Sequence, residues 1–369
     1  MSTFNVFRDR TVLVTGHTGF KGSWLCTWLI QLGARVVGVS NDIPTSPSNF
    51  LASGLDLLVE HHCVDVTDFE KLKNVVEVSQ PDFIFHLAAQ ALVRPSYQSP
   101  LDTFLINGIG SANVLEAVRS SKKLVSVVMV TSDKAYDNVE WVWGYRETDR
   151  IGGKDPYSAS KGMAELAIRS YVASYMAEDE QNLRVGIARA GNVIGGGDWA
   201  TDRIVPDCVK AWSQRKIVDI RNPNATRPWQ HVLEPLSGYL SLGAELYQSN
   251  KLHGEAYNFG PPANQDFSVK HLIVQMQQYW ENIAWSDESK IKDQVHEAGL
   301  LKLNCDKALA ELHWRPTLGF EETVRLTAVW YKRFYENKDD TMIDFTIGQI
   351  KEFERLAKEK SISWAVDAV

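Results

Sequence analysis

A hydroxyl, a carboxylate and an amine follow directly on an apolar stretch in the middle of the chain. Residues 124–130 read LVSVVMV, and residues 131–136 continue as TSDKAY. An apolar run rich in β-branched residues and bounded by polar ones is typical of a strand buried on both faces. Ligands of open α/β sheets bind beyond the carboxyl ends of such strands. A lone Asp-Lys pair also occurs in ordinary solvated turns. The residues predicted to face a bound molecule are Thr131, Ser132, Asp133 and Lys134.

A tyrosine and a lysine, four residues apart, form a second pair of side chains that could take part in catalysis. In the sequence DPYSASK, Asp155 suits the N-cap of a helix and Pro156 its first position. Tyr157 and Lys161 then share one helix face. An ammonium beside a phenol lowers the pKa of the phenol, so the pair predicts a base that takes a proton from a hydroxyl group. The spacing is common by chance, and the alternative is two residues on a solvated helix face.

A glycine-rich turn connects the first strand to the first helix. The apolar segment 11–15 leads into GHTGFKG, a helical pattern over residues 23–32 ends at Gly33, and a strand follows over 35–39. In this setting, glycines let the backbone approach a pyrophosphate, and the helix start supplies unpaired N–H groups. The alternative is a tight turn with close helix packing. The predicted cofactor contacts of the turn are Gly16, Gly19, Phe20 and Gly22.

The end of the second strand favours NAD over NADP. A residue that binds the adenosine ribose is expected here, and the chain offers Ser40 and, two residues later, Asp42. Between Val36 and Asn49 there is no arginine or lysine to receive a 2′-phosphate. NAD is therefore the predicted cofactor, and the choice between Ser40 and Asp42 stays open.

Further strands are predicted over 61–65, 83–87 and 183–190, with a helix over 69–78, which gives a sheet of the 3-2-1-4-5-6 type. After the fourth strand, the small residues Ala88 and Ala89 would let a cofactor lie close to the backbone. Residues 101–120 are helical in pattern. Asn107 lies on the largely apolar face of this helix, where an amide is more often a satisfied core group than a catalytic one.

A change of composition after residue 190 divides the chain. The sequence GNVIGGGDW begins a glycine-rich, less regular region, and a long amphipathic helical pattern covers residues 320–360. The predicted domains are residues 1–190 for the cofactor, with later segments free to return to it, and residues 191–369 mainly for the substrate.

The composition of the chain limits the classes of function that it can have. The chain has 369 residues, 44% of them hydrophobic, and a net charge of −7, which argues against a general nucleic-acid binder. Any anionic ligand needs a local basic cluster instead, and Arg203, Arg221 and Arg227 are candidates for holding a diphosphate. Each of them alone is more often a surface charge; Arg227, in RPWQHV, is favoured.

The four cysteines are widely spaced and form no metal-ligand pattern, so reduced thiols and no metal are expected. No apolar run approaches the roughly 20 residues that span a bilayer, and no secretory signal is evident. A cytoplasmic protein without membrane contact is predicted.

Five features of the sequence point to one family: the glycine turn, HLAA at 86–89, Asn107, the Tyr157/Lys161 pair and GNV at 191–193. Together they resemble the extended short-chain dehydrogenase/reductase family over essentially the whole chain. Within that family, TSDKAY resembles the sugar-nucleotide 4,6-dehydratases, which usually have Ser-Thr-Asp-Glu-x-Tyr. Here Lys134 takes the place of the glutamate. This departure, together with NPNATRPWQHV, implies CDP-glucose as the substrate.

The resemblance implies an α/β fold: a Rossmann-type doubly wound parallel sheet with a smaller, mixed α/β C-terminal substrate domain. It also implies a redox-neutral lyase reaction on a tightly held NAD+. Tyr157, assisted by Lys161, would take the proton of the sugar 4-OH. Lys134 would then remove the C5 proton while Asp133, beside Ser132, protonates the departing 6-hydroxyl, giving a 4-keto-6-deoxy sugar nucleotide and water. A homodimer, or a homotetramer as a dimer of dimers, is expected.

The resemblance extends to binding residues, residue by residue. The matching cofactor positions are Asp65 and Val66, for adenine, with Ala88 and Ala89. The matching substrate positions are Asn192 and Arg227, followed by Arg94, Arg203 and Arg221. No motif identifies the residues that read the cytosine.

Three other functions compete with this prediction. An NAD-dependent sugar-nucleotide 4-epimerase would use Tyr157 but has no need of Asp133 and Lys134. A dehydratase for another NDP-hexose would use all of them. A non-catalytic NAD-sensing regulator would typically lack the Tyr157/Lys161 pair, which this chain keeps.

Overall fold

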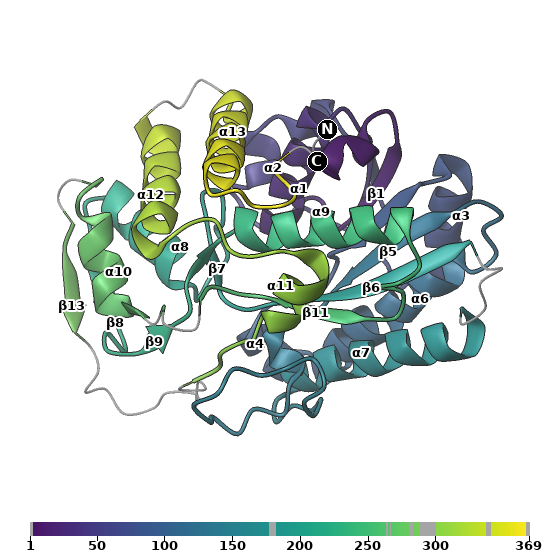
Figure 1. Ribbon diagram of the computed structural model, residues 1–369. Helices are drawn as coiled ribbons and strands as arrows, with labels where there is room; N and C mark the ends of the chain where they lie inside the picture. The colour runs from purple at the N-terminus through teal and green to yellow at the C-terminus, as the bar shows by residue number, and fades with distance from the viewer. Residues whose placement is uncertain are drawn as a thin grey trace.

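The computed structural model describes residues 3–176, 182–262, 265, 267–280, 283–287, 300–336 and 341–366. At its centre is a parallel sheet of seven strands in the order β11-β6-β5-β4-β1-β2-β3, drawn in Figure 1. This arrangement confirms the predicted α/β class and the 3-2-1-4-5-6 order, and it adds a seventh strand. The strands are Thr11–Thr15 (β1), Arg35–Ser40 (β2), Glu60–Cys63 (β3), Phe83–His86 (β4), Val125–Val130 (β5), Leu183–Ala190 (β6) and Ala256–Phe259 (β11).

The sheet is buried on both faces because its strands are apolar at consecutive positions. Val12 and Val14 pack into one apolar cluster, whereas Leu13, between them, packs into another on the opposite face. This is the pattern of a doubly wound sheet. The first face is covered by Phe20–Gln31 (α1), Leu233–Gln248 (α9) and Ile343–Glu359 (α13). The second is covered by Phe69–Ser79 (α3), Gly110–Val118 (α6) and Pro156–Tyr175 (α7).

The helix predicted over 101–120 is confirmed over residues 101–118, and it contains a π-helical turn. Pro100–Phe104 (α5) and α6 are separated by a π-helical turn, Leu105–Ile109 (η3). Asn107 lies in this turn, and its side-chain amide bonds the backbone of Gln90 and the hydroxyl of Ser160. Single π turns inside helices often occur at functional sites. Asn107 is thus a satisfied buried amide that joins α7 to the loop after β4.

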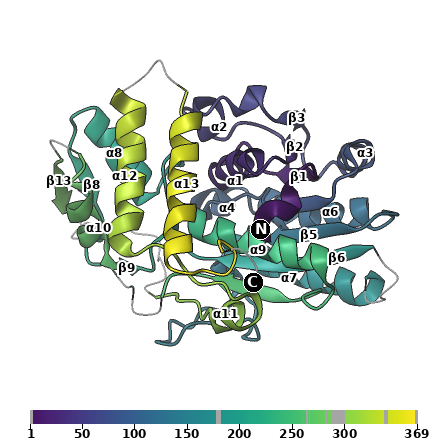
Figure 2. The same ribbon diagram turned by 45° about the horizontal axis from the view of Figure 1, so that its top comes forward.

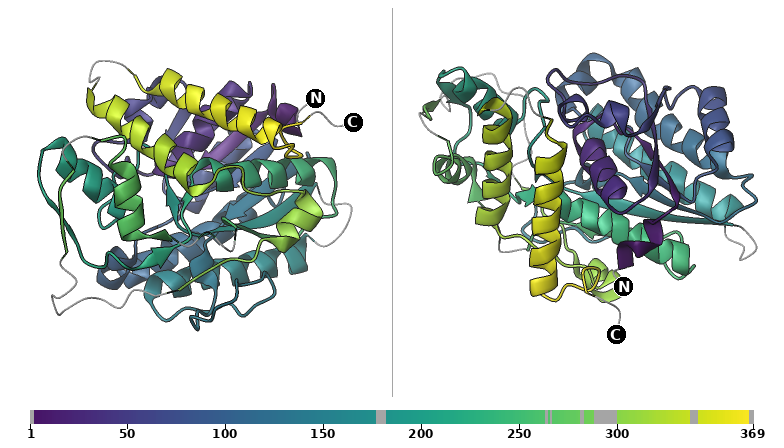
Figure 3. Two further views of the ribbon diagram at one scale, coloured as in Figure 1. Left: turned by 60° about the vertical axis from the view of Figure 1, so that its left-hand side comes forward. Right: turned by 90° about the horizontal axis from the view of Figure 1, so that it is seen from above.

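The C-terminal half of the chain contributes to both parts of the molecule. β11 pairs with β6, and α9 packs on β5 and β6. The predicted helical region 320–360 is two helices, Phe320–Glu336 (α12) and α13, and residues 337–340 between them lie outside the described residues. Figures 2 and 3 show α13 alongside α12 and close to α1. The boundary at residue 190 stays a prediction.

The smaller part of the molecule is built from short elements. Two-stranded ladders join β10 to β7, β12 to β9 and β13 to β8. Within the described ranges, the helices are too short or too polar to cross a membrane. The remaining elements are η1 (Thr3–Phe7), α2 (Asn49–Ala52), η2 (Leu55–Leu57), α4 (Val93–Gln98), η4 (Asp133–Ala135), β7 (Val193–Ile194), α8 (Ile204–Ser213), β8 (Val218–Ile220), β9 (Thr226–Arg227), β10 (Gln230–His231), β12 (Phe267–Ser268), α10 (Val269–Met276), β13 (Trp285–Asp287) and α11 (Asp306–Leu312).

Candidate active site

The acid-base pair lies in a short 3-10 turn, η4, immediately beyond β5. Ser132 caps this turn: its hydroxyl accepts a hydrogen bond from the Lys134 backbone N–H (3.2 Å) and donates one to Asp133 Oδ1 (2.9 Å). Burial raises the pKa of the Asp133 carboxyl, and Lys134 and the Ser132 hydroxyl oppose that rise. A carboxyl that holds its proton more tightly than usual is suited to act as an acid.

Asp133 faces a cavity whose other walls come from the C-terminal half of the chain. The sequence did not identify these walls, because most of them are glycine, proline or apolar residues without a motif. The described residues that line the cavity with Asp133 are Gly191, Pro228, Gly260, Pro261, Pro262, Gln265, Leu301, Lys302 and Leu303.

Tyr157 and Lys161 lie in the first turns of α7, as predicted. The Asp155 carboxylate accepts a hydrogen bond from the Ser158 N–H (3.0 Å), which confirms the predicted cap. Burial raises the pKa of Tyr157 to about 12, against the lowering influence of Ser132 and Arg203. Burial lowers the pKa of Lys161 to about 8. The expected lowering of the Tyr157 pKa is therefore wrong for the cofactor-free chain, because desolvation of the phenolate outweighs the nearby cations.

This direction can be tested by titration. In the cofactor-free protein, we expect Tyr157 to stay protonated beyond the ordinary phenol pKa of 10.0, because its own pKa is about 12. Ultraviolet difference titration of the wild type against Tyr157→Phe isolates the tyrosinate of this residue. A tyrosinate signal of Tyr157 near neutral pH would contradict the expectation.

The turn before α1 requires glycines because its backbone packs closely against itself and against the loop after β4. Gly16 has a φ of +72°, and a Cβ on it would come within 2.7 Å of the Ala88 backbone nitrogen. A Cβ on Gly22 would lie 2.1 Å from the Gly16 carbonyl oxygen. Helix α1 begins after Gly19 without a side-chain cap. Its first N–H groups are therefore available to an anion, and the turn fits the pyrophosphate of a dinucleotide.

The two candidates for the ribose differ in environment. The Ser40 hydroxyl is buried and 3.1 Å from His17 Nδ1, and His17 Nε2 is 2.8 Å from His61 Nδ1. Burial lowers the pKa of His17 to about 4, so this chain of contacts is neutral. Asp42, by contrast, is exposed. Ser40 is thus already engaged by protein, whereas the Asp42 carboxylate lies at the surface.

The predicted adenine residues lie in the loop after β3. The Asp65 carboxylate accepts hydrogen bonds from the Asn41 amide and from Thr67, whereas Val66 is buried and its backbone oxygen accepts a bond from Asn113. These contacts fix the loop in one conformation.

One cation of the site, Lys21, was missed by sequence reasoning. It stands in the first turn of α1, and its charge interacts with Asp133, Lys161 and Arg203. Burial, together with Arg203, lowers the pKa of Lys21 to about 8, and Asp133 opposes that lowering. Its position directly before Gly22 in the glycine motif was the available clue.

The arginines predicted to bind the substrate differ in the residues that they contact. Arg94 and Arg221 converge on Asp202 from distances of 2.9 and 3.3 Å. Arg203 lies 2.7 Å from Asp198 and interacts with Tyr157. Among the remaining predicted residues, Arg227 donates a hydrogen bond to the Thr226 carbonyl on β9, and Asn192 follows β6.

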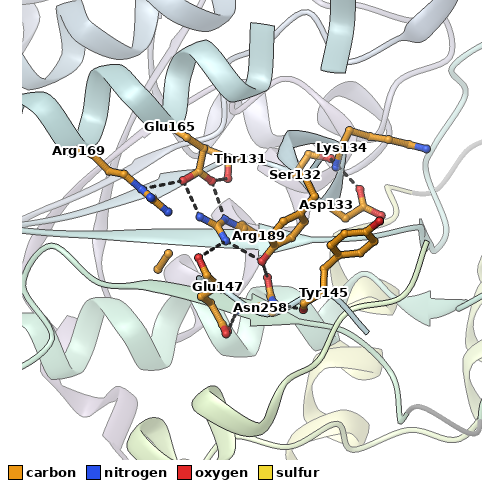
Figure 4. Close-up of polar contacts among 12 residues, drawn as sticks. Thr131, Ser132, Asp133, Lys134, Tyr145, Glu147, Glu165, Arg169, Arg189 and Asn258 are labelled. Carbon is orange, nitrogen blue, oxygen red and sulfur yellow. Dashed lines mark hydrogen bonds and ion pairs between the residues drawn. The ribbon is translucent and has the colours of Figure 1, made fainter. Parts of the chain in front are cut away.

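A buried ion pair lies beneath η4, as Figure 4 shows. Arg189 on β6 and Glu165 on α7 make two hydrogen bonds, of 2.8 and 2.9 Å, and neither side chain is exposed. Glu165 also accepts a bond from Thr131, and Arg189 donates one to the phenol of Tyr136. Sequence reasoning passed over Arg189, although an arginine inside the apolar strand 183–190 was a sign of such a pair.

Removing one member of this pair is expected to be costly. Arg189→Met should lower the free energy of unfolding by roughly 3–5 kcal/mol, because it leaves the Glu165 carboxylate buried without its partner. The matched control is Arg169→Met. Arg169 is 44% exposed and 3.9 Å from the same carboxylate, so its loss should cost less than about 1 kcal/mol. Urea denaturation measures both, and equal losses would contradict the expectation.

Comparison with known proteins agrees with this geometry. The sequence model of a family described as GDP-mannose 4,6 dehydratase matches residues 13–327. A CDP-glucose 4,6-dehydratase of Salmonella typhimurium is 45% identical over 340 residues, which cover 91% of this chain and 94% of that protein.

Two solved structures share the fold. The epimerase Mth375 of Methanothermobacter thermautotrophicus has a TM-score of 0.77 and 25% identity, covering 90% of this chain and 95% of its own. A dTDP-glucose 4,6-dehydratase of Bacillus anthracis, solved in complex with NAD, has a TM-score of 0.71 and 20% identity, covering 89% of this chain and 98% of its own.

Proposed function

The chain belongs to the GDP-mannose 4,6 dehydratase family, and on that basis we propose that it is an NAD+-dependent hydro-lyase. It converts CDP-glucose to CDP-4-keto-6-deoxyglucose and water. The observation that carries this proposal is Asp133, which lies at the end of β5 next to Lys134, lines a cavity and interacts with Tyr157. The 45% identity to the Salmonella typhimurium enzyme supports CDP-glucose as the sugar nucleotide.

In the oxidation step, Tyr157 takes the proton of the sugar 4-hydroxyl. Bound NAD+ would supply the hydride acceptor for C4 and, once reduced, the hydride donor for C6. Burial raises the pKa of Tyr157 to about 12 in the cofactor-free chain, and the Ser132 hydroxyl and Arg203 oppose that rise by favouring the phenolate. The buried position of Tyr157 keeps water from the reacting proton.

In the elimination step, Lys134 removes the proton on C5, which the 4-keto group has made acidic. Asp133, whose pKa is raised by burial, protonates the 6-hydroxyl as it leaves. Ser132 holds the Asp133 carboxyl through its 2.9 Å hydrogen bond. A scaffold that only oxidises and re-reduces C4 needs neither Asp133 nor Lys134, and this distinguishes the proposal from a 4-epimerase.

The binding residues are assigned from their positions. For the cofactor, we assign the glycine turn with Phe20 to the pyrophosphate, Asp42 rather than the engaged Ser40 to the ribose, and the loop of Asp65 and Val66 to the adenine. Ala88 and Ala89 line its path over β4. For the substrate diphosphate we assign Asn192, Arg203 and Arg227, with Arg94 and Arg221 at the surface pair on Asp202.

We further propose a cytoplasmic homo-oligomer. Its four cysteines carry free thiols, which suits a reducing compartment. Exposed apolar side chains on α5, η3 and α7 suit the pairing of two copies through these helices. They include Leu101 (76% exposed), Leu105, Ile109 and Leu166 (62% exposed).

The proposal is tested by incubating the purified protein with CDP-, UDP-, GDP- and dTDP-hexoses and following the 4-keto product in alkali. Product from CDP-glucose, with solvent deuterium incorporated at C5, is expected. Product from dTDP-glucose but not CDP-glucose would refute the nucleotide and keep the reaction. Inversion at C4 without a keto product would replace the dehydratase by a 4-epimerase.

A further inference from the structure

We propose that the Glu165–Arg189 ion pair is a positioning element that anchors both ends of residues 131–136 and thereby holds the elimination residues in register with the oxidation residues (Figure 4). This inference rests on the proposed function, because it assigns the two catalytic pairs to two successive steps.

The first anchor is at the start of the segment. The Thr131 hydroxyl donates a 2.6 Å hydrogen bond to Glu165 Oε1, and its backbone N–H donates to the Ala188 carbonyl on β6. Glu165 lies one helical turn beyond Lys161 on α7. One carboxylate therefore connects the end of β5 to the helix that carries Tyr157 and Lys161.

The second anchor is at the end of the segment. The phenol of Tyr136 accepts a 2.6 Å hydrogen bond from Arg189 Nη1 and donates a 2.8 Å bond to Asn258 Oδ1 on β11. The Arg189 guanidinium also lies over the Tyr136 ring, 4.8 Å from its centroid. All three side chains are at most 1% exposed. Because every polar group of this anchor has a buried partner, it has little freedom to shift.

Asp133 and Lys134 lie between the two anchors in a single turn. That turn is closed by two backbone hydrogen bonds, from Ala135 to Ser132 and from Tyr136 to Asp133. Tyr157, in contrast, takes its backbone position from α7, whose start is capped by Asp155, and it contacts the segment through the Ser132 hydroxyl. Loosening either anchor should therefore displace the elimination residues and leave Tyr157 in place. A displacement of about 1 Å at reacting groups can cost as much as 10²-fold in rate.

Conservative variants test this inference. Tyr136→Phe removes only the hydroxyl that joins Arg189 to Asn258, and Thr131→Val removes only the hydroxyl that binds Glu165. Both keep the ion pair, so neither leaves a buried charge unpartnered. The matched controls make the same chemical changes at buried sites away from the turn. Tyr257→Phe removes a bond to Glu311, and Thr327→Val removes one within α12.

The measurement separates the two steps. After rapid mixing with CDP-glucose, the rise in reduced-cofactor absorbance reports oxidation, and its decay, with deuterium exchange at C5, reports elimination. In both anchor variants, we expect the decay to slow about 10-fold or more and the rise to change less than about twofold. The controls should change neither phase.

Circular dichroism and substrate KM establish that the variants are folded and bind normally. If Tyr136→Phe and Thr131→Val leave both phases unchanged, or slow both equally, the inference is overturned. Failure of the proposed function has a different signature, because the wild type itself would then form no keto sugar from CDP-glucose.

Discussion

Replacing Tyr157 with phenylalanine is expected to lower kcat about 10²- to 10⁴-fold, because the change removes the phenolic oxygen that we propose takes the proton of the 4-hydroxyl. The variant keeps the aromatic ring, which is 8% exposed and packed within the site. Substrate binding should therefore persist, with KM changed only a few-fold. Initial rates and single-turnover absorbance of the reduced cofactor measure both quantities.

A second variant separates loss of the base from loss of packing. Tyr239→Phe removes the hydroxyl of another fully buried tyrosine, on α9. We expect that variant to retain most of the activity. If Tyr157→Phe formed reduced cofactor at the wild-type rate, another group would be the base and the assignment would fail.

The Lys134→Ala variant is expected to oxidise C4 and then stall. In the proposed mechanism, Lys134 acts in elimination but not in the proton transfer at the 4-hydroxyl. Steady-state turnover should fall about 10²- to 10⁴-fold, while the first rise of reduced cofactor stays within a few-fold of wild type. Deuterium from solvent should no longer enter C5. Rapid mixing and mass spectrometry of the recovered sugar nucleotide give the two readouts.

The matched control for this variant is Lys154→Ala, which removes an exposed lysine directly before α7. Lys134→Glu should recover part of the turnover, because a carboxylate at the same position can also accept the C5 proton. Unchanged turnover in Lys134→Ala would refute the role of the residue. A block before cofactor reduction would instead place it in oxidation.

Local sequence patterns predicted most of the sheet. The strands Thr11–Thr15 and Leu183–Ala190 have the predicted bounds, because their apolar runs coincide with burial on both faces. The strand predicted over 61–65 is Glu60–Cys63 instead. It lies at the edge of the sheet and is partly exposed, so its sequence carries a weaker apolar pattern. The first helix likewise begins at Phe20, inside the glycine motif, rather than at residue 23.

The helix predicted over 101–120 is confirmed over residues 101–118, but its π-helical turn was not predicted, for a different reason. Its apolar spacing is helical throughout, but Asn107 bonds residues that are 17 and 53 positions away. Contacts of this length leave no periodic trace in a sequence. The same holds for β11, which joins the sheet next to β6 although it begins at residue 256.

The sequence by itself determined the chemistry that this chain can perform. The glycine turn, the Tyr157/Lys161 spacing and TSDKAY are local requirements, since each is fulfilled within seven consecutive residues or fewer. Only the tertiary structure decided how these groups behave. Burial raises the pKa of Tyr157 to about 12, and Lys21 joins the site from α1. The pair of Arg189 and Glu165 lies beneath η4. Desolvation and ion pairing depend on which residues, distant in the sequence, pack against one another in the fold. The spacing of residues within a short motif does not specify this packing.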